Sequence, residues 1–145
     1  MPKIVIIRGA ICTGKTTITH LLRKRLLHYA LIEPDILKEM VDNGRSSLWR
    51  RKVAEKTILF LIAQLMEYRR NIIVALHSHS LLMYNLIKKL AHEYSYKSYP
   101  FLLVAPLEVV LIRSKNRGVP KMRYLIPKSK IDLLPNNFRN EIFRF

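Results

Sequence analysis

The stretch that decides the fold of this chain is Gly9-Ala10-Ile11-Cys12-Thr13-Gly14-Lys15-Thr16. It follows the apolar run 3–8 and leads into residues 17–22, where apolar side chains recur at helical spacing. The pattern Gly-x4-Gly-Lys-Thr therefore stands between a predicted buried strand and a predicted helix. This is the setting that a phosphate-binding loop, or P-loop, requires.

Each residue type in the loop has a physical task. Gly9 and Gly14 allow a tight turn that points backbone N–H groups inward, where the positive end of the next helix also attracts phosphate oxygens. We expect Lys15 to reach the β- and γ-phosphates of ATP or another nucleoside triphosphate, and the Thr16 hydroxyl to bind Mg²⁺. The predicted nucleotide-binding residues are Gly9, Ala10, Ile11, Cys12, Thr13, Gly14, Lys15, Thr16 and Thr17. The alternative is a glycine-containing loop that only joins a core strand to a core helix.

Composition narrows the class of protein. Half of the 145 residues are hydrophobic, which predicts one folded domain over residues 1–145 and excludes a disordered chain. No apolar run reaches the length of about 18 residues that a membrane span needs, so we expect no membrane partner. The single cysteine, Cys12, excludes an internal disulfide framework and fits a reducing cytoplasm. We therefore expect a cytoplasmic protein, whose oligomeric state stays open.

The charge balance indicates a kind of partner. The chain has 26 Lys and Arg against 10 Asp and Glu, a formal net charge of +16. So large an excess predicts long-range attraction of polyanions, of which nucleic acid is the commonest. The alternative is a solvated basic surface without such a partner.

Strands and helices are expected to alternate along the chain. The predicted strands span 3–8, 29–32, 71–76 and 99–105, and the predicted helices span 15 to about 29, 36–41, 46–68, 81–93 and 107–116. This order predicts an α/β fold, a three-layer α/β/α sandwich with a parallel sheet. Because ligands bind beyond the carboxyl ends of parallel strands, we expect the loop, Asp35, residues 77–79 and the chain from Ala105 onward to gather at that edge.

Several finer features follow from the pattern. Asn43-Gly44 is expected to close the helix 36–41, and Ser46 or Ser47 to cap the next helix. Beyond Gly118 we expect one short helix near 121–125 and a basic, partly irregular tail from about 126. The apolar side chains expected to be buried in the helix 46–68 are Trp49, Val53, Leu59, Phe60, Ile62, Ala63 and Met66. The stripe expected in the helix 81–93 is Leu82, Leu86 and Leu90.

Asp35, just past the second predicted strand, is a candidate general base. A carboxylate there could take the proton of an acceptor hydroxyl. It could equally be the N-cap of the helix that follows, although Lys38 at the third position after it leaves the capping box incomplete. The spacing alone favours neither role.

Two further groups have alternative interpretations. Arg113 and Arg117 lie four residues apart at the end of a predicted helix and so share a face. They could stabilise the charge of a transferring phosphoryl group as part of a lid around 113–120, or they could be basic residues that favour a helix C-terminus. His77 and His79 could hold a metal, but a His-x-His pair is more often a polar strand end.

The sequence resembles the P-loop kinase domain of the phage-type polynucleotide 5′-kinases and related small ATP kinases. Besides the loop, the shared elements are Asp35-Ile36-Leu37-Lys38, the lid pattern Arg113-Ser114-Lys115-Asn116-Arg117-Gly118, the Val119-Pro120 that follows it, and the stretch Ala105-Pro106-Leu107-Glu108 that leads to the lid. The resemblance implies that Lys15 and Thr16 serve ATP and Mg²⁺, that Asp35 activates the acceptor hydroxyl and that Lys38 contacts the phosphate of the acceptor. It also implies that Arg117, supported by Arg113, clamps the donor phosphates.

The sequence departs from the family pattern at three places. Ile11-Cys12 stands where the family usually has Pro-Gly, and Lys38 replaces an arginine, which gives up bidentate phosphate geometry. The strand 72–76 ends on Ala75-Leu76 without the expected acid. Glu33, Asp35 or Ser78 would have to substitute for it near Mg²⁺.

Three functions remain open at this point. The first is an ATP-dependent kinase that transfers the γ-phosphoryl group to the 5′-hydroxyl of RNA or DNA, which the charge and the Asp35, Lys38 and Arg117 set favour. The second is a kinase of a small molecule or nucleotide on the same fold. The third is a nucleotide-dependent nucleic-acid-binding protein without efficient catalysis, which the missing strand-end acid suggests.

Overall fold

A computed structural model of the chain describes residues 1–41, 48–78 and 80–117. In chain order its elements are β1 (Lys3–Gly9), α1 (Lys15–Arg25), β2 (Tyr29–Ile32), α2 (Pro34–Val41), α3 (Leu48–Glu67), β3 (Asn71–His77), α4 (Leu81–Glu93), β4 (Lys97–Leu103) and α5 (Leu107–Asn116). Two compact units result: Met1–Gly9 with Gly14–Leu103, and Ala10–Thr13 with Val104–Phe145. The first unit holds the whole sheet.

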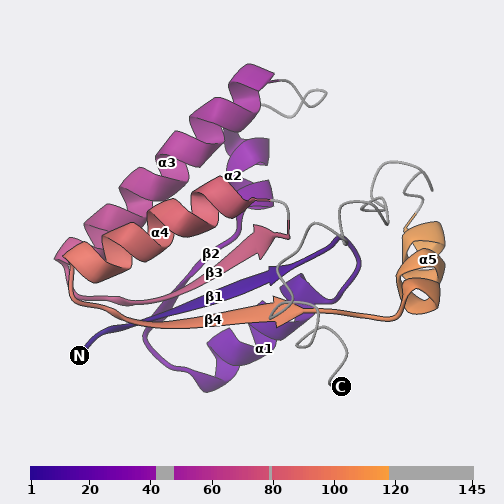
Figure 1. Cartoon of the computed structure of the whole chain (residues 1–145), viewed down its shortest axis with the longest axis horizontal. Helices are drawn as coiled ribbons and strands as arrows, with labels where there is room; N and C mark the ends of the chain where they lie inside the picture. The colour runs from indigo at the N-terminus through magenta and orange to yellow at the C-terminus, as the bar shows by residue number, and fades with distance from the viewer. Residues whose placement is uncertain (42–47, 79, 118–145) are drawn as a thin grey trace. The chain divides into compact units, whose positions relative to one another are not determined.

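The sheet has four parallel strands in the order β2-β3-β1-β4 (Figure 1). The strand β1 lies between β3 and β4, which is the central position that its apolar sequence predicts. Its register with β3 pairs Ile4 with Ile72 and brings Gly9 opposite His77. The end of β3 therefore lies beside the start of the glycine-containing loop.

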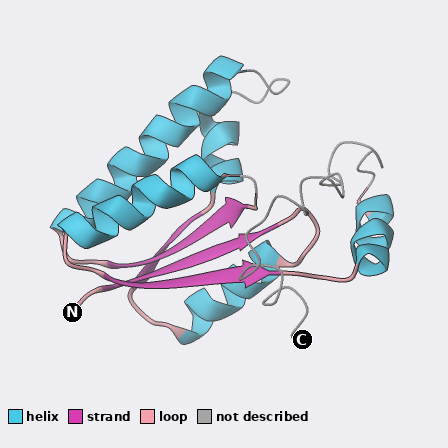
Figure 2. Ribbon diagram, in the orientation of Figure 1, coloured by secondary structure: helices cyan, strands magenta, loops and turns pink. Residues whose placement is uncertain are grey.

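Helices cover both faces of the sheet, α1 on one face and α3 with α4 on the other (Figure 2). Successive side chains of a strand point to opposite faces, so Ile4 and Ile6 pack toward α3 and α4 while Val5 and Ile7 pack toward α1. The larger core lies on the α3 and α4 side. This arrangement confirms the predicted α/β/α sandwich with a parallel sheet.

The predicted boundaries hold for most elements and are wrong for three, namely α1, β4 and the start of α2, which lies at Pro34 and not at residue 36. The helix α1 ends at Arg25, not near residue 29, because the chain turns through His28, whose φ of 66° is left-handed, before β2 begins. The strand β4 spans Lys97–Leu103 and not 99–105. It starts early because the chain reverses at Ser95, with φ 57°, directly after α4. Its first residues are polar, so the apolar pattern hid them.

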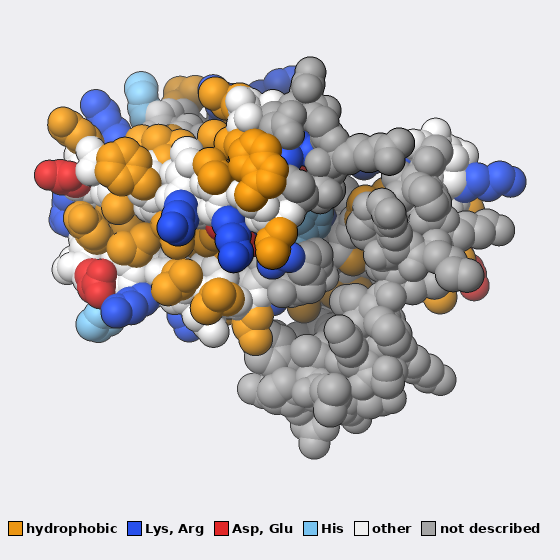
Figure 3. Space-filling view, turned by 90° about the horizontal axis from the view of Figure 1, so that it is seen from above, with side chains coloured by type: hydrophobic (Ala, Val, Ile, Leu, Met, Phe, Trp, Pro, Cys, Tyr) orange, Lys and Arg blue, Asp and Glu red, His pale blue; other side chains and the backbone are white. Residues whose placement is uncertain are grey.

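The predicted buried faces of two helices are also partly wrong. The buried stripe of α3 is Ala54, Ile58, Ile62 and Met66. Trp49, Val53 and Phe60, expected in the core, are exposed. In α4 the buried stripe is Met83, Ile87 and Ala91, one position along from the expected one, and Leu82 and Leu86 face outward. Both helices are apolar on more than one face, so spacing alone could not select the buried one. Figure 3, seen from the α3 and α4 side, shows orange hydrophobic side chains among blue Lys and Arg.

An apolar groove of about 420 Å³ lies on the α1 face of the sheet. Its walls come from β1, β2, β4, α1 and the residue that follows α1, and apart from Lys3 its lining has no charged side chain. The lining is therefore almost entirely apolar, unlike that of a phosphate site. Within the described ranges, every helix is too short or too polar to traverse a lipid bilayer.

Some predictions fall outside the described residues. They concern the turn at Asn43-Gly44, the caps Ser46 and Ser47, His79, the lid residues 118–120, the helix near 121–125 and the basic tail from about 126. The prediction of a single domain over 1–145 also stays a prediction.

Candidate functional site

The predicted phosphate loop joins β1 to α1. The strand ends at Gly9 and the helix begins at Lys15. Two residues of the loop have left-handed backbone angles, Cys12 with φ 61° and Gly14 with φ 96°. Gly14 adopts this conformation without steric cost, which explains why a glycine stands directly before the helix. Within the turn, the Thr13 hydroxyl donates to the Ala10 carbonyl over 2.8 Å.

The N-terminus of α1 suits an anion. Its N-cap is Gly14, which has no side chain to bond the first N–H groups, and its first turn has no acidic residue. The N–H groups and the positive helix end can therefore serve phosphate oxygens. Lys15 is partly exposed and Thr16 is exposed, so both side chains can reach a ligand. A hydroxyl such as that of Thr16 fits Mg²⁺, which prefers oxygen ligands and usually keeps several waters.

Glu33, which directly follows β2, ties that strand to α1. Its Oε2 lies 2.9 Å from His20 Nε2, and its Oε1 lies 3.5 Å from the hydroxyl of Thr19. The buried Thr19 hydroxyl also donates to the carbonyl of Thr16 over 3.0 Å. Of the three side chains that could replace the missing strand-end acid, Glu33 is thus connected to the Thr16 turn.

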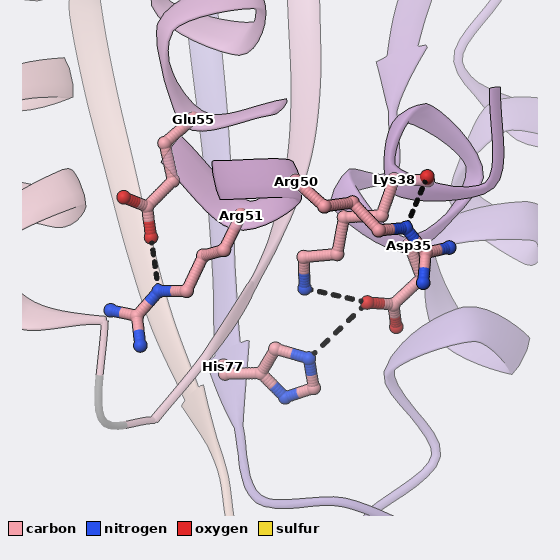
Figure 4. A network of polar contacts seen from close by, with 6 residues as sticks. All are labelled: Asp35, Lys38, Arg50, Arg51, Glu55 and His77. Atoms are coloured by element: carbon pink, nitrogen blue, oxygen red, sulfur yellow. Dashed lines mark hydrogen bonds and ion pairs between the residues drawn. The ribbon is translucent and has the colours of Figure 1, made fainter. Parts of the chain in front are cut away.

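Asp35 lies in a polar network with Lys38 and His77 (Figure 4). Lys38 Nζ donates to Asp35 Oδ1 over 3.0 Å, and His77 Nε2 lies 3.4 Å from the same oxygen. The alternative role of Asp35 as the N-cap of α2 is wrong, because α2 begins at Pro34 and places Asp35 in its first turn. The missed start has a simple cause, since proline suits the first position of a helix.

The network sets the charge of Asp35. The pKa of its carboxyl lies well below the ordinary value, chiefly because His77 donates a hydrogen bond to it. Partial burial raises the pKa, and the hydrogen bond and charge of Lys38 lower it again. The side chain is still 68% exposed, so water screens these charges. Asp35 is therefore an open carboxylate that stays ionised.

The basic residues of the first turn of α3 have partners on the protein. Arg50 Nε donates to the carbonyl of Lys38 over 2.7 Å and so joins α3 to α2. Arg51 Nε pairs with Glu55 over 2.8 Å (Figure 4). This packing holds Lys38, and with it the Asp35 end of α2, against α3.

Arg8 is a residue of this edge that the sequence reasoning did not single out. Its Nη2 donates to the Ser78 carbonyl over 2.6 Å, and its guanidinium lies 4.6 Å from the ring centre of Tyr84. Burial lowers its pKa, although an arginine remains charged at any ordinary pH. The signal was available, because Arg8 is a charged residue that directly follows the apolar residues 4–7 of the central strand. It holds the chain that follows His77.

The second unit contains the predicted lid helix α5 and the loop residues Ala10–Thr13. There Arg113 Nη1 donates to the carbonyl of Cys12 over 3.3 Å. Arg117, the C-cap of α5, is one turn from Arg113, and its N–H donates to the Arg113 carbonyl. The backbone thus places the two arginines one helical turn apart, and their shared face stays a prediction.

Metal binding by the histidines finds no support. His79 is outside the described residues, and in the remainder no group of three or more His, Cys, Asp and Glu side chains could hold a metal ion. His77 instead contacts Asp35. Ala75 and Leu76, which precede it, are buried, so β3 brings no acid to this edge.

Comparisons with known proteins agree with this architecture. A family model described as an AAA domain matches residues 5–144. A chain of the Pnkp1/Rnl/Hen1 RNA repair complex has a TM-score of 0.65 at 21% identity, over 99% of this chain and 47% of that chain. The Deinococcus radiodurans tunicamycin resistance protein has a TM-score of 0.64 at 21% identity, and the match covers 99% of this chain and 84% of that one. Acinetobacter baumannii shikimate kinase has a TM-score of 0.61 at 17% identity, and the match covers 99% of this chain and 79% of that one. A search of curated proteins finds no match.

These likenesses confirm the predicted P-loop NTPase fold and the resemblance to small P-loop kinases. At such identities they show the fold alone. The chain spans about half the length of the RNA repair chain that it matches.

Proposed function

This chain belongs to the AAA domain family, and we propose that it transfers the γ-phosphoryl group of ATP to a hydroxyl group, the acceptor being the 5′-hydroxyl end of a nucleic acid. The observation that carries the proposal is the Asp35 carboxylate, which contacts Lys38 and also His77, the residue that lies opposite Gly9 at the start of the phosphate loop.

The donor side of the proposal rests on the loop. The uncapped N-terminus of α1 offers N–H groups to phosphate oxygens, and Lys15 adds a positive charge. Thr16 would hold Mg²⁺, which when bound to ATP offsets the negative charge of the β- and γ-phosphates. Arg117, with Arg113 in support, is the proposed clamp for the charge that develops on the phosphoryl group.

The acceptor side rests on Asp35. In the described part of the chain both of its contacts end on Oδ1, so Oδ2 is open to accept a hydrogen bond from an acceptor hydroxyl. A carboxylate with a low pKa is a weak base. It suits phosphoryl transfer all the same, because in a loose transition state the hydroxyl mainly needs orientation and gives up its proton late.

The proposed transfer forms one bond to phosphorus and breaks another. The acceptor oxygen forms a bond to the γ-phosphorus while the bond from that phosphorus to the β,γ-bridging oxygen breaks. The hydroxyl proton passes to Oδ2 of Asp35, and ADP leaves with the electron pair of the broken bond. Lys15 and the arginines stabilise the charge on the donor phosphates, and none of them forms a covalent bond.

A nucleic acid as acceptor is supported by charge. A net charge of +16 is far more than one nucleotide requires, and it favours a substrate with many phosphates. The likeness to a chain of an RNA repair complex points in the same direction, although this chain spans 47% of that one. Lys38 is the proposed contact for a phosphate of the acceptor.

A small-molecule kinase is the second candidate. The specific observation in its favour is that shikimate kinase and the tunicamycin resistance protein have the same fold at comparable TM-scores. Such a kinase would need only the loop, Asp35 and the clamp. It would leave most of the basic surface without a role.

ATP consumption with matched oligonucleotides separates these functions. We expect a 5′-hydroxyl oligonucleotide to stimulate turnover, and the same oligonucleotide with a 5′-phosphate to bind without stimulating it. Stimulation by a mixture of sugars and metabolites but not by the oligonucleotide favours the second candidate. Binding of both oligonucleotides with no ATP consumption identifies a nucleic-acid binder without catalysis. The Lys15→Ala variant controls for a contaminating ATPase.

A further inference from the structure

His77 contacts Asp35, and the proposed roles of the phosphate loop and of Asp35 give His77 itself no task. It is the last residue of β3 and lies opposite Gly9, the last residue of β1. The next residue is fixed as well, because Ser78 N–H donates to the Gly9 carbonyl over 3.0 Å and Ser78 O accepts from Arg8. The backbone directly after His77 is therefore held beside the start of the phosphate loop.

The side chain of His77 reaches across to α2. Its Nε2 lies 3.4 Å from Oδ1 of Asp35, and the imidazole is only 25% exposed. For Nε2 to donate, its proton must be on that nitrogen, in the neutral tautomer or in the imidazolium. In Figure 4 the ring and the Lys38 ammonium approach the same carboxylate oxygen from different sides.

The two partners of Asp35, Lys38 and His77, differ in whether they can hold its carboxylate in place relative to the sheet. Lys38 is three residues along the same helix, so it moves with Asp35 whenever α2 moves. His77 is 42 residues away and belongs to the sheet. No residue of α2 is fully buried, and the helix packs mainly against α3, where Arg50 donates to the Lys38 carbonyl. Of the contacts to Asp35 in the described ranges, the one from His77 ties the carboxylate to the sheet that carries the loop.

The other charged groups nearby have different partners. Arg50 directs its Nε to the Lys38 carbonyl, and Arg51 pairs with Glu55 on its own helix. In Figure 4 the dashed lines that reach the Asp35 carboxylate start from Lys38 and His77. Among the described residues, the groups that lower the pKa of Asp35 are thus one cation from its own helix and one imidazole from the sheet.

We infer that His77 is a positioning residue for the phosphoryl acceptor, which holds Oδ1 of Asp35 so that Oδ2 faces the acceptor hydroxyl. The inference rests on the proposed function, since it gives His77 a task only if Asp35 receives that hydroxyl. His77 acts through Asp35 and touches neither ATP nor the acceptor. A misplacement of a reacting group by about 1 Å can cost about a hundredfold in rate, which sets the scale of the expected effect.

A double-mutant cycle tests this role. His77→Leu should lower kcat by about ten- to a hundredfold with KM for ATP unchanged. His77→Gln, which presents an N–H at a similar reach, should restore most of the loss. In the Asp35→Asn background His77→Leu should have almost no further effect, because the group that it positions is already gone. Melting temperatures of all variants show whether each one folds.

A second readout does not depend on activity. The carboxyl carbon of Asp35, followed by NMR, should show an ionised group at pH 4 in the wild type. In His77→Leu its pKa should rise toward the ordinary value, because the largest cause of its lowering is removed.

The outcomes separate the two proposals. An equal fold-loss from His77→Leu in both backgrounds, or an unchanged titration of Asp35 in that folded variant, overturns the role of His77 and leaves the kinase intact. Failure of the wild type to phosphorylate any acceptor overturns the proposed function and the positioning role with it. The titration would then still report whether His77 and Asp35 are in contact.

Discussion

Replacement of Asp35 by asparagine separates the chemical role of this residue from its structural one. The amide keeps the shape of the side chain and an oxygen that can accept from Lys38 and His77, but it cannot take a proton. Loss of a positioned base lowers turnover by about two to four orders of magnitude, which corresponds to about 2.7–5.5 kcal/mol in the activation free energy. ATP affinity should change little, because the loop is untouched.

The structure predicts a small change in stability for the same variant. Asp35 is not the N-cap of α2, and its pair with Lys38 is largely exposed. An exposed pair contributes about 0.2–1 kcal/mol, so the melting temperature should fall by less than about 4 °C. Turnover, ATP binding and thermal melting are measured on the same preparation. Near-normal turnover in a stable Asp35→Asn protein would refute the reasoning.

The pH dependence of stability has a definite sign. The pKa of Asp35 is lowered in the folded state, so its contribution is present above its ordinary value of 3.8 and is lost as pH falls through the folded value. The difference in unfolding free energy between the wild type and Asp35→Asn should therefore be constant near neutral pH and shrink below about pH 4. A difference that grows in acid would contradict the lowered pKa.

Three further predictions concern the loop, the basic surface and the core. Lys15→Ala should abolish ATP-dependent turnover but leave the melting curve almost unchanged, because the partly exposed side chain of Lys15 belongs to no core cluster. Undiminished turnover in this variant would contradict the proposed role of the loop in binding ATP. Oligonucleotide affinity should fall steeply with salt, with the slope of the log–log plot steeper by about 0.7 for each single-strand phosphate contacted; a flat plot would favour a small-molecule acceptor. Tyr96→Phe should lower the free energy of unfolding by about 1 kcal/mol, since the Tyr96 hydroxyl donates to the Arg70 carbonyl over 2.7 Å; calorimetry that finds no change would exclude a contribution from this bond.

The sequence was most informative for features that depend on residues close to one another along the chain. The loop and the strands β1 and β3 were predictable because apolar runs and glycines act locally. The helices α4 and α5 also begin and end at the predicted residues. Pro106 before α5 shows why, since proline marks the start of a helix without any tertiary contact.

Features that depend on tertiary packing were harder to predict. Trp49 and Phe60 are as apolar as the buried Ile58 and Ile62, and only the direction in which α3 meets the sheet decides that they face outward. The contact between His77 and Asp35 joins residues 42 apart. Both could be assigned to the carboxyl edge of the sheet, but no sequence spacing indicates that the imidazole reaches that carboxylate.

The central claim is that this chain phosphorylates the 5′ end of a nucleic acid, and transfer of label from γ-labelled ATP tests it most directly. The wild type is incubated with an oligonucleotide that has a 5′-hydroxyl and a blocked 3′ end, in parallel with Lys15→Ala and with the 5′-phosphorylated oligonucleotide. The account predicts label at the 5′ end in the first reaction and in neither control. An oligonucleotide that stays unlabelled while the protein binds it, or label that appears equally with Lys15→Ala, would contradict the claim.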